Sequence, residues 1–300
     1  MTLPPCNRRS APTHWGFYYQ ILRAVPAHLH PMTSTSSHLA PLPPPDDPAV
    51  ALPAGCSLAL ASGTMRLESS VLVGGAPFRA MRLSEPAGVA LDELTAAGLG
   101  DDDVRARFAR RLVAAGMLNA SWPIGTGPST SDVTIVIPVK DRPRELEALL
   151  TSLAGMATIV VDDGSAEPNV LQSIADRHGA RFRSLPISKG PGAARNAGMA
   201  MVTTPLTCFL DSDCIVKGEW LSALLPALAD PLVAAVAPRV IGAPGHGSRA
   251  AFERAASPLD LGPAPALVRP GSSVTFVPAA CLVVRTSLGP SLFDERLTVG

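Results

Sequence analysis

The sequence predicts an α/β fold in which a parallel sheet, built from alternating strands and helices, follows a small winged-helix-like α+β domain. Three observations support this prediction. Beyond residue 132, short apolar runs alternate with segments whose apolar residues recur at helical spacing. Hydrophobic residues make up 47% of the chain and charged residues 17%, a composition that can form a packed core. Two of the apolar runs end directly in aspartates, where the strands of such a sheet bind ligands.

The composition divides the chain into four parts. The first 50 residues contain ten of the 31 prolines, and such a segment buries too little apolar surface to offset its ordering entropy. We therefore expect a disordered, proline-rich tail over 1–50. We expect the small domain at 51–122, a Gly/Pro/Ser/Thr linker at 123–131, and the α/β domain at 132–300.

Turn and capping residues organise the small domain. The segment Arg66–Val73 alternates in polarity and ends in two glycines, which predicts a turn between two short strands. Ser84 and Asp101 are the expected N-caps of two helices. The domain can be a module that binds a peptide or partner, or a structural appendage, and its sequence leaves both open. DNA binding is disfavoured because aspartates offset the arginines of the second helix.

Five strands are expected in the α/β domain, with helices between them. The strands lie at 133–137, 158–161, 181–185, 206–210 and 233–237. The first is a continuous apolar run, as expected for a strand that is buried on both faces. Pro143 suits the first turn of the helix that follows, in which leucines at helical spacing form a buried stripe.

Acidic residues follow two of these strands. Asp162 and Asp163 come directly after one, and Asp211 and Asp213 after another. Parallel strands place their carboxyl ends at one edge of the sheet, so these carboxylates should gather there. Gathered carboxylates repel unless a cation or a ligand compensates them. An Asp-x-Asp pair at a strand end can offer a carboxylate to magnesium or manganese, which would also bridge a diphosphate.

A glycine-rich helix start faces the same edge. Lys189-Gly-Pro-Gly192 precedes a helix that carries Arg195. We expect free N–H groups at this helix start. Together with the positively charged side chains of Lys189 and Arg195, they suit phosphate oxygens. The spacing imitates a dinucleotide fingerprint, but Arg195 stands where the third glycine belongs, so a Rossmann dehydrogenase is rejected.

Charge and cysteine usage exclude other classes. Basic and acidic residues balance at 25 each, whereas nucleic-acid binders usually carry a basic excess. The five cysteines form no Cys-x-x-Cys pair, which disfavours a zinc site or a disulfide framework and favours reduced thiols in a cytoplasm. No apolar run reaches the roughly 18 residues of a membrane span.

Four motifs in order carry a family resemblance. They are Ile137-Pro-Val-Lys-Asp141, Val160-Val-Asp-Asp-Gly-Ser165, Gly192-Ala-Ala-Arg-Asn-Ala-Gly198 and Leu210-Asp-Ser-Asp213. Together they resemble the family-2 glycosyltransferases of GT-A fold, over about residues 132–300. Leu259-Asp-Leu-Gly262, the segment 274–280, Phe293-Asp-Glu295 and the domain ahead of them resemble the mycofactocin-system branch of that family.

The resemblance implies roles for residues on the nucleotide side. Asp163 matches the aspartate that accepts a hydrogen bond from the uracil of the donor. Pro138 and Asp141 match the loop that lines the nucleoside, and Arg195 matches the arginine that reaches the nucleotide.

The resemblance also implies the metal and acceptor sides. Asp213 matches the carboxylate on the divalent cation, manganese or magnesium, and Asp211 faces the ribose and the sugar. The segment 278–281 matches the floor of the acceptor site. The catalytic base of the family is an aspartate in a Glu-Asp pair, which is expected beyond Gly300, so the catalytic domain within 132–300 is expected to be incomplete.

The expected activity is therefore transfer of a sugar, glucose from UDP-glucose, to a hydroxyl of a small-molecule or peptide-derived acceptor such as mycofactocin. The reaction would be a metal-assisted single displacement with inversion. The alternative is a non-catalytic protein that binds nucleotide and peptide and lacks the base. A nucleotidyltransferase is disfavoured because the loop after the first strand holds no glycine. The expected location is the cytoplasm, and attachment to the inner face of the membrane stays open.

Overall fold

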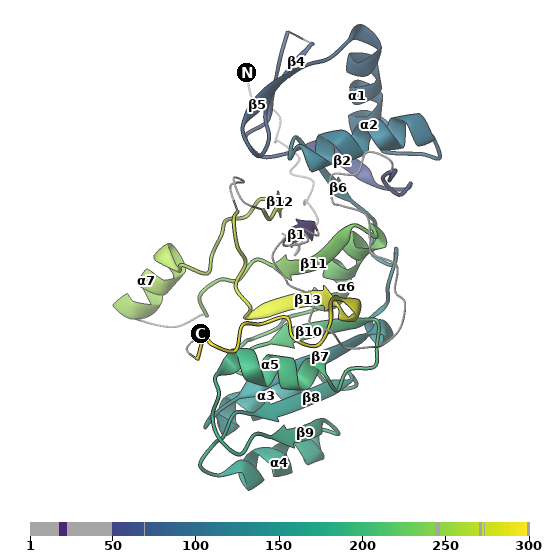
Figure 1. The fold of residues 1–300 in the computed structure, drawn as a ribbon. Helices are drawn as coiled ribbons and strands as arrows, with labels where there is room; N and C mark the ends of the chain where they lie inside the picture. Colours follow the sequence, from purple (N-terminus) through teal and green to yellow (C-terminus); the bar gives the residue numbers. More distant parts are fainter. Residues whose placement is uncertain are drawn as a thin grey trace, which may run out of the picture.

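The computed structural model describes residues 18–22, 50–68, 70–243, 247–269, 272 and 274–298. It contains a larger domain built on an eight-stranded sheet, with the order β12-β1-β11-β13-β10-β7-β8-β9. A smaller domain with a two-stranded and a three-stranded sheet lies beyond the β12-β1-β11 side of this sheet (Figure 1).

The small domain is more strand-rich than its sequence predicted. Its elements are β2 (Ser57–Leu60), β3 (Met65–Leu67), β4 (Val71–Gly74), β5 (Arg79–Arg82), α1 (Glu85–Ala97), α2 (Asp103–Ala114) and β6 (Leu118–Ser121). The expected turn at the paired glycines joins β4 to β5, and Ser84 precedes α1 as expected. The N-cap of α2 is Asp102 and not Asp101, because Asp102 accepts a hydrogen bond from the Arg105 N–H at 3.0 Å.

The larger domain alternates strands and helices. In chain order it contains β1 (Tyr18–Leu22), β7 (Val133–Val139), α3 (Pro143–Ser152), β8 (Thr158–Asp162), α4 (Pro168–Arg177), β9 (Arg181–Ser184), α5 (Pro191–Met199), β10 (Leu206–Leu210), α6 (Trp220–Leu224), β11 (Val233–Pro238), α7 (Ser248–Ala256), β12 (Ala266–Leu267) and β13 (Cys281–Arg285). All five strands expected from the sequence are present.

The sheet is mixed and not wholly parallel. Strands β10, β7, β8 and β9 run parallel to one another, as predicted. Strand β13 lies between β10 and β11 and is antiparallel to both. The prediction of a parallel sheet is therefore right for the half formed by β10-β7-β8-β9 and wrong at β13 and β1, whose partners are more than 40 residues away in the chain.

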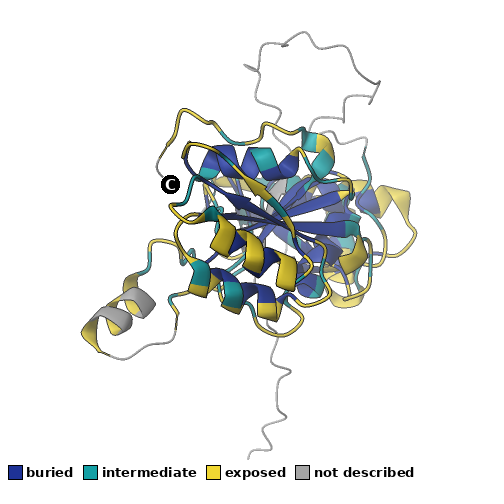
Figure 2. Cartoon of the chain, turned by 90° about the horizontal axis from the view of Figure 1, so that it is seen from below, coloured by how far each residue is buried: buried dark blue, intermediate teal, exposed yellow. Residues whose placement is uncertain are grey.

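Helices cover both faces of the sheet. Leucines of α3 and α4 pack against one face, and α5 packs against the other. The strands between these layers are buried along their whole length, and the outer helices keep exposed sides (Figure 2). Gly198 of α5 lies directly on the side chain of Val136, where a Cβ would collide, so α5 sits close to the sheet.

Strand β1 falls within the segment expected to be disordered. It pairs antiparallel with β11, and β12 pairs with it in parallel. At these five residues the structure differs from the expectation, because main-chain pairing with a distant strand leaves no local signal. The rest of the predicted tail lies outside the described residues.

A buried ion pair joins the two domains. Arg110 of α2 donates to both carboxylate oxygens of Asp230, at 2.6 and 2.8 Å, and their side chains are 1% and 2% exposed. Arg110 also donates to the carbonyl of Val50 at 3.2 Å, and Arg285 of β13 donates to the carbonyl of Asp230 at 2.9 Å. The Arg110–Asp230 ion pair thus links the small domain to the larger one, and hydrogen bonds to the main chain surround it.

Candidate functional site

The acidic motifs meet at one edge of the sheet, as the sequence predicted. Strands β7, β8 and β10 run in parallel, so the residues that follow their carboxyl ends form neighbouring loops. The Asp163 N–H donates to the carbonyl of Val139 at 2.9 Å and binds the loop after β8 to the end of β7. Pro138 is buried in β7, next to this junction.

Asp141 joins the loops that follow β7 and β8. It adopts φ 53°, a left-handed conformation that aspartate tolerates better than most residues. Its N–H donates to Ser165 Oγ at 2.9 Å, and its Oδ1 accepts from the Ala166 N–H at 2.9 Å. Asp141 therefore shapes the rim of the site through its main chain and its side chain together.

The two aspartates at the end of β8 have different surroundings. Asp162 is fully buried and accepts from the Ser165 N–H at 2.9 Å and from Ser184 Oγ at 2.6 Å, so it closes the turn. Asp163 accepts from Ser188 Oγ at 2.8 Å and from the N–H groups of Lys189 and Gly190 at 2.8 and 3.0 Å.

Asp163 thus fixes the loop that leads into α5. A carboxylate can accept about four hydrogen bonds, and three are made within the protein. By this count about one acceptor position has no partner within the protein, and the residue is 5% exposed. The turn beneath this contact needs Gly164, because its φ is +68° and a Cβ would lie 2.6 Å from the main-chain nitrogen of Ser188.

The glycine-rich start of α5 differs in part from the expectation of free N–H groups for phosphate. The N–H of Gly190 already donates to Asp163. A Cβ at Gly190 would lie 2.6 Å from the carbonyl oxygen of Thr298, and one at Gly192 would lie 3.4 Å from Phe293 Cβ. The glycines give room for the chain's own segment 293–298, whereas Lys189 stays exposed at the edge.

Arg195 and Asp211 form a partly buried pair. Arg195 Nη2 lies 2.5 Å from Asp211 Oδ1, and the side chains are 8% and 32% exposed. Arg195 also lies over the ring of Phe293, with Cζ 5.3 Å from the centroid. Burial raises the pKa of the Asp211 carboxyl and outweighs the opposing effect of the Arg195 charge. The pair therefore places one cation and one carboxylate beside the strand end.

Asp213 lies farther out and is paired with Arg142. Both side chains are 51% exposed, and the guanidinium contacts one carboxylate oxygen. Sequence reasoning missed Arg142, because nothing in the pattern of one loop identifies a partner 71 residues away. An exposed pair of this kind exchanges partners at little cost.

These carboxylates suit a divalent cation shared with a substrate. Within the described part of the chain, no group of three or more His, Cys, Asp or Glu side chains is arranged to hold a metal by itself. Magnesium is usually held by one or two carboxylates together with substrate phosphates. Asp213 and its neighbour Asp211 fit that donor set.

The segment expected to floor the acceptor site lies beside these aspartates. The N–H of Asp211 donates to the carbonyl of Ala280 at 2.9 Å, and Cys214 Sγ contacts the same carbonyl at 3.3 Å. Cys281 pairs with Leu210 in the ladder between β10 and β13. The residues expected to floor the acceptor site thus adjoin the acidic edge.

The described cysteines are free thiols. Burial raises the pKa of Cys56 to about 11 and that of Cys214 to about 12, so both are protonated at neutral pH. Cys6 lies outside the described residues. No helix among the residues the structure describes is both long and apolar enough to cross a membrane.

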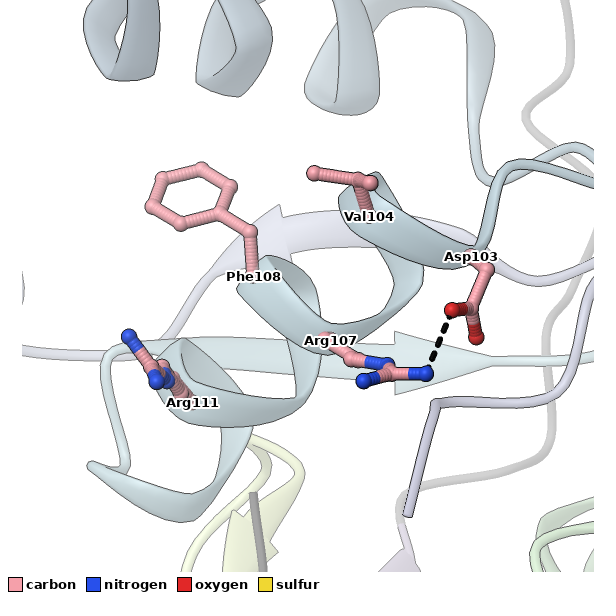
Figure 3. Close-up of a pocket in the computed structure, with 5 residues that line it drawn as sticks. All are labelled: Asp103, Val104, Arg107, Phe108 and Arg111. Atoms are coloured by element: carbon pink, nitrogen blue, oxygen red, sulfur yellow. Dashed lines mark ion pairs between the residues drawn. The ribbon is translucent and has the colours of Figure 1, made fainter. Parts of the chain in front are cut away.

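A pocket away from the acidic edge lies on the small domain. It is lined by Asp103, Val104, Arg107, Phe108 and Arg111 of α2 (Figure 3). The side chains of Val104 and Phe108 point to the same side of the helix, and Arg107 pairs with Asp103 at 2.6 Å. This surface is separate from the residues gathered at the ends of β8 and β10.

Comparison with known proteins places these motifs in a family. Glycosyl transferase family 2 matches residues 134–288. The pre-mycofactocin glycosyltransferase of Mycobacterium tuberculosis is 41% identical over 238 residues, which is 78% of this chain and 50% of the relative. An uncharacterised glycosyltransferase of Mycobacterium bovis is 35% identical over 82 residues, 27% of this chain and 36% of that protein.

Among solved structures, a mannosyltransferase from Pyrobaculum calidifontis in complex with GDP-Man and Mn²⁺ matches with a TM-score of 0.33 and 21% identity, covering 38% of this chain and 37% of that one. The chain spans about half the length of the pre-mycofactocin glycosyltransferase it matches. The family match covers about half of the chain, including every motif at the acidic edge. The chain therefore belongs to glycosyl transferase family 2 and has the GT-A-type fold of these glycosyltransferases.

Proposed function

We propose that this chain binds UDP-glucose together with a divalent cation at the acidic edge and transfers glucose to an acceptor hydroxyl. The observation that carries the proposal is the gathering of Asp163, Arg195, Asp211 and Asp213 around the ends of β8 and β10. The name of the Mycobacterium tuberculosis relative supports a mycofactocin precursor as the acceptor.

Each group has a role that its surroundings support. Asp213, released from Arg142, would hold the cation with the donor diphosphate, and Asp211 would face the ribose and the sugar. Arg195 would add positive charge for the nucleotide. The open acceptor position of Asp163 would receive the uracil N–H, with Pro138 and Asp141 along the nucleoside.

The reaction is a single displacement. The acceptor oxygen forms a bond to the anomeric carbon as the bond from that carbon to the diphosphate oxygen breaks, and the configuration inverts. The diphosphate leaves with the electron pair, and the hydroxyl proton passes to a general base, a role that we assign to none of the residues the structure describes. When bound, manganese or magnesium neutralises the charge that develops on the leaving group.

Calorimetry of UDP, GDP and UDP-glucose, with and without manganese, tests the proposal. We expect uridine nucleotides to bind in a cation-dependent manner, and Asp213→Ala to abolish that dependence. Asp103→Ala is a matched control, because Asp103 also forms an exposed pair with an arginine but lies in the small domain. Unchanged UDP affinity in Asp213→Ala, or in excess chelator, would remove the cation from the proposal.

A further inference from the structure

The segment 293–298 is held on helix α5 by one side chain. Asn196 Nδ2 donates to the carbonyl of Phe293 at 2.8 Å, and the Phe293 N–H donates to Asn196 Oδ1 at 3.0 Å. Asn196 Nδ2 also lies 3.0 Å from Glu295 Oε1. Asn196 is 5% exposed, so these bonds replace contacts with water. The amide pairs with Phe293 as a neighbouring strand would.

The glycines at the start of α5 make this contact close. Gly190 adopts φ +92°, and a Cβ there would lie 2.6 Å from the carbonyl oxygen of Thr298. Any side chain at position 190 would be strained and would push the segment away from the helix. The main chain of α5 and that of the segment therefore touch without intervening side chains.

The ring of Phe293 connects this anchor to the charged pair. It packs edge-on against Phe209 of β10, with centroids 4.9 Å apart. The Arg195 guanidinium lies over the same ring and bonds to Asp211 at 2.5 Å. Contacts thus run without a break from Asn196 through Phe293 to Arg195 and Asp211.

We propose that Asn196 is a positioning residue of the donor site. It holds Phe293 as the platform on which Arg195 rests, and through that platform it sets where the Arg195–Asp211 pair meets the nucleotide. The same amide keeps the segment 293–298 seated on α5. The identity of the ligand in this inference rests on the proposed function, whereas the anchor itself does not.

Hydrogen exchange of the ligand-free protein tests the anchor. We expect Asn196→Ala to speed amide exchange in 293–298, beginning with the Phe293 N–H. Asn196→Asp keeps an acceptor for that N–H but sets a carboxylate oxygen against the Phe293 carbonyl and the Glu295 carboxylate, so an effect at least as large is expected. Thr207→Val is the matched control, because it removes a buried side-chain hydrogen bond of 2.8 Å to Thr286 outside this segment. Unchanged exchange in Asn196→Ala, with the control also unchanged, would overturn the proposal.

Nucleotide affinity tests the link to Arg195. We expect Asn196→Ala and Phe293→Leu each to weaken UDP binding in manganese by up to about tenfold, as expected when a desolvated cation–π platform is lost. Because both substitutions act through one ring, the double variant should bind UDP no more weakly than the single variant with the lower affinity. Multiplied effects in the double variant would overturn the link. Absence of UDP binding by the unaltered chain would refute the proposed donor, and the exchange experiment would still decide the anchor.

Discussion

Two arginine–aspartate pairs of this molecule differ in almost every respect. Arg110 and Asp230, at the junction of the domains, are nearly inaccessible to solvent, and two hydrogen bonds join them. Arg142 and Asp213, at the edge of the sheet, are half exposed, and a single contact joins them. The first pair has further main-chain partners around it, whereas the second faces solvent.

We interpret the first pair as structural and the second as available to a ligand. A buried charge that loses its partner has no water to replace it, so the partners of the first pair are fixed by the fold. An exposed pair contributes little to stability and can give up its partner to a ligand. The two pairs therefore predict opposite patterns of stability and binding.

The largest effect is expected at the domain junction. Asp230→Ala leaves Arg110 buried without its carboxylate and should lower the free energy of unfolding by about 3–5 kcal/mol. Urea unfolding measures this change, and calorimetry of the folded fraction should show nearly unaltered UDP affinity. A loss below about 1 kcal/mol, as at an exposed pair, would contradict the comparison.

Asp163 lies at the edge of the sheet but has hydrogen-bond partners within the protein, so it combines features of both pairs. Asp163→Asn should weaken uridine nucleotides by about 1.5–3 kcal/mol, the size of one charged hydrogen bond, and should weaken inorganic diphosphate less. Calorimetry with both ligands measures the difference. Equal losses would mean that Asp163 acts mainly by holding the loop at 188–190.

Acidification should affect binding at Asp211 before it affects ordinary carboxyl groups. Burial raises the pKa of Asp211 above its usual value, so its carboxylate is protonated at a higher pH than an exposed aspartate. The pKa of Asp211 is higher in the folded protein than in the unfolded chain, so its protonation on acidification stabilises the folded protein. Manganese-dependent UDP affinity should therefore fall as the pH is lowered, without loss of stability from Asp211. Affinity that stays constant until the protein unfolds would argue against ligand contact by Asp211.

The smallest effect is expected at the exposed pair. Arg142→Gln should change the free energy of unfolding by less than about 1 kcal/mol. It should strengthen manganese binding modestly, because the guanidinium no longer competes for Asp213. A manganese titration at fixed UDP measures this. Weaker manganese binding would show that Arg142 contacts the donor and does not merely compete with the cation.

Local patterns were sufficient for the central strands and for the acidic edge. The strands over 133–139, 158–162 and 206–210 are mostly apolar, and burial on both faces explains them. The aspartates that follow β8 and β10 could be placed together because parallel strands end at the same edge. Pairing between distant residues was not predictable, since β1, β13, Arg142 and the Asn196–Phe293 contact all depend on partners far along the chain.

The place of β13 in the sheet has a consequence for how the domain is made. The strand follows both β10 and β11 in the chain, yet it lies between them in the sheet. Until residues 281–285 are available, β10-β7-β8-β9 and β12-β1-β11 are two half-sheets with no shared hydrogen-bonded neighbour. Each half-sheet would then present an open strand edge, which favours association with other chains. We therefore expect completion of this sheet to depend on the docking of β13, and contacts of such long range are slow to form.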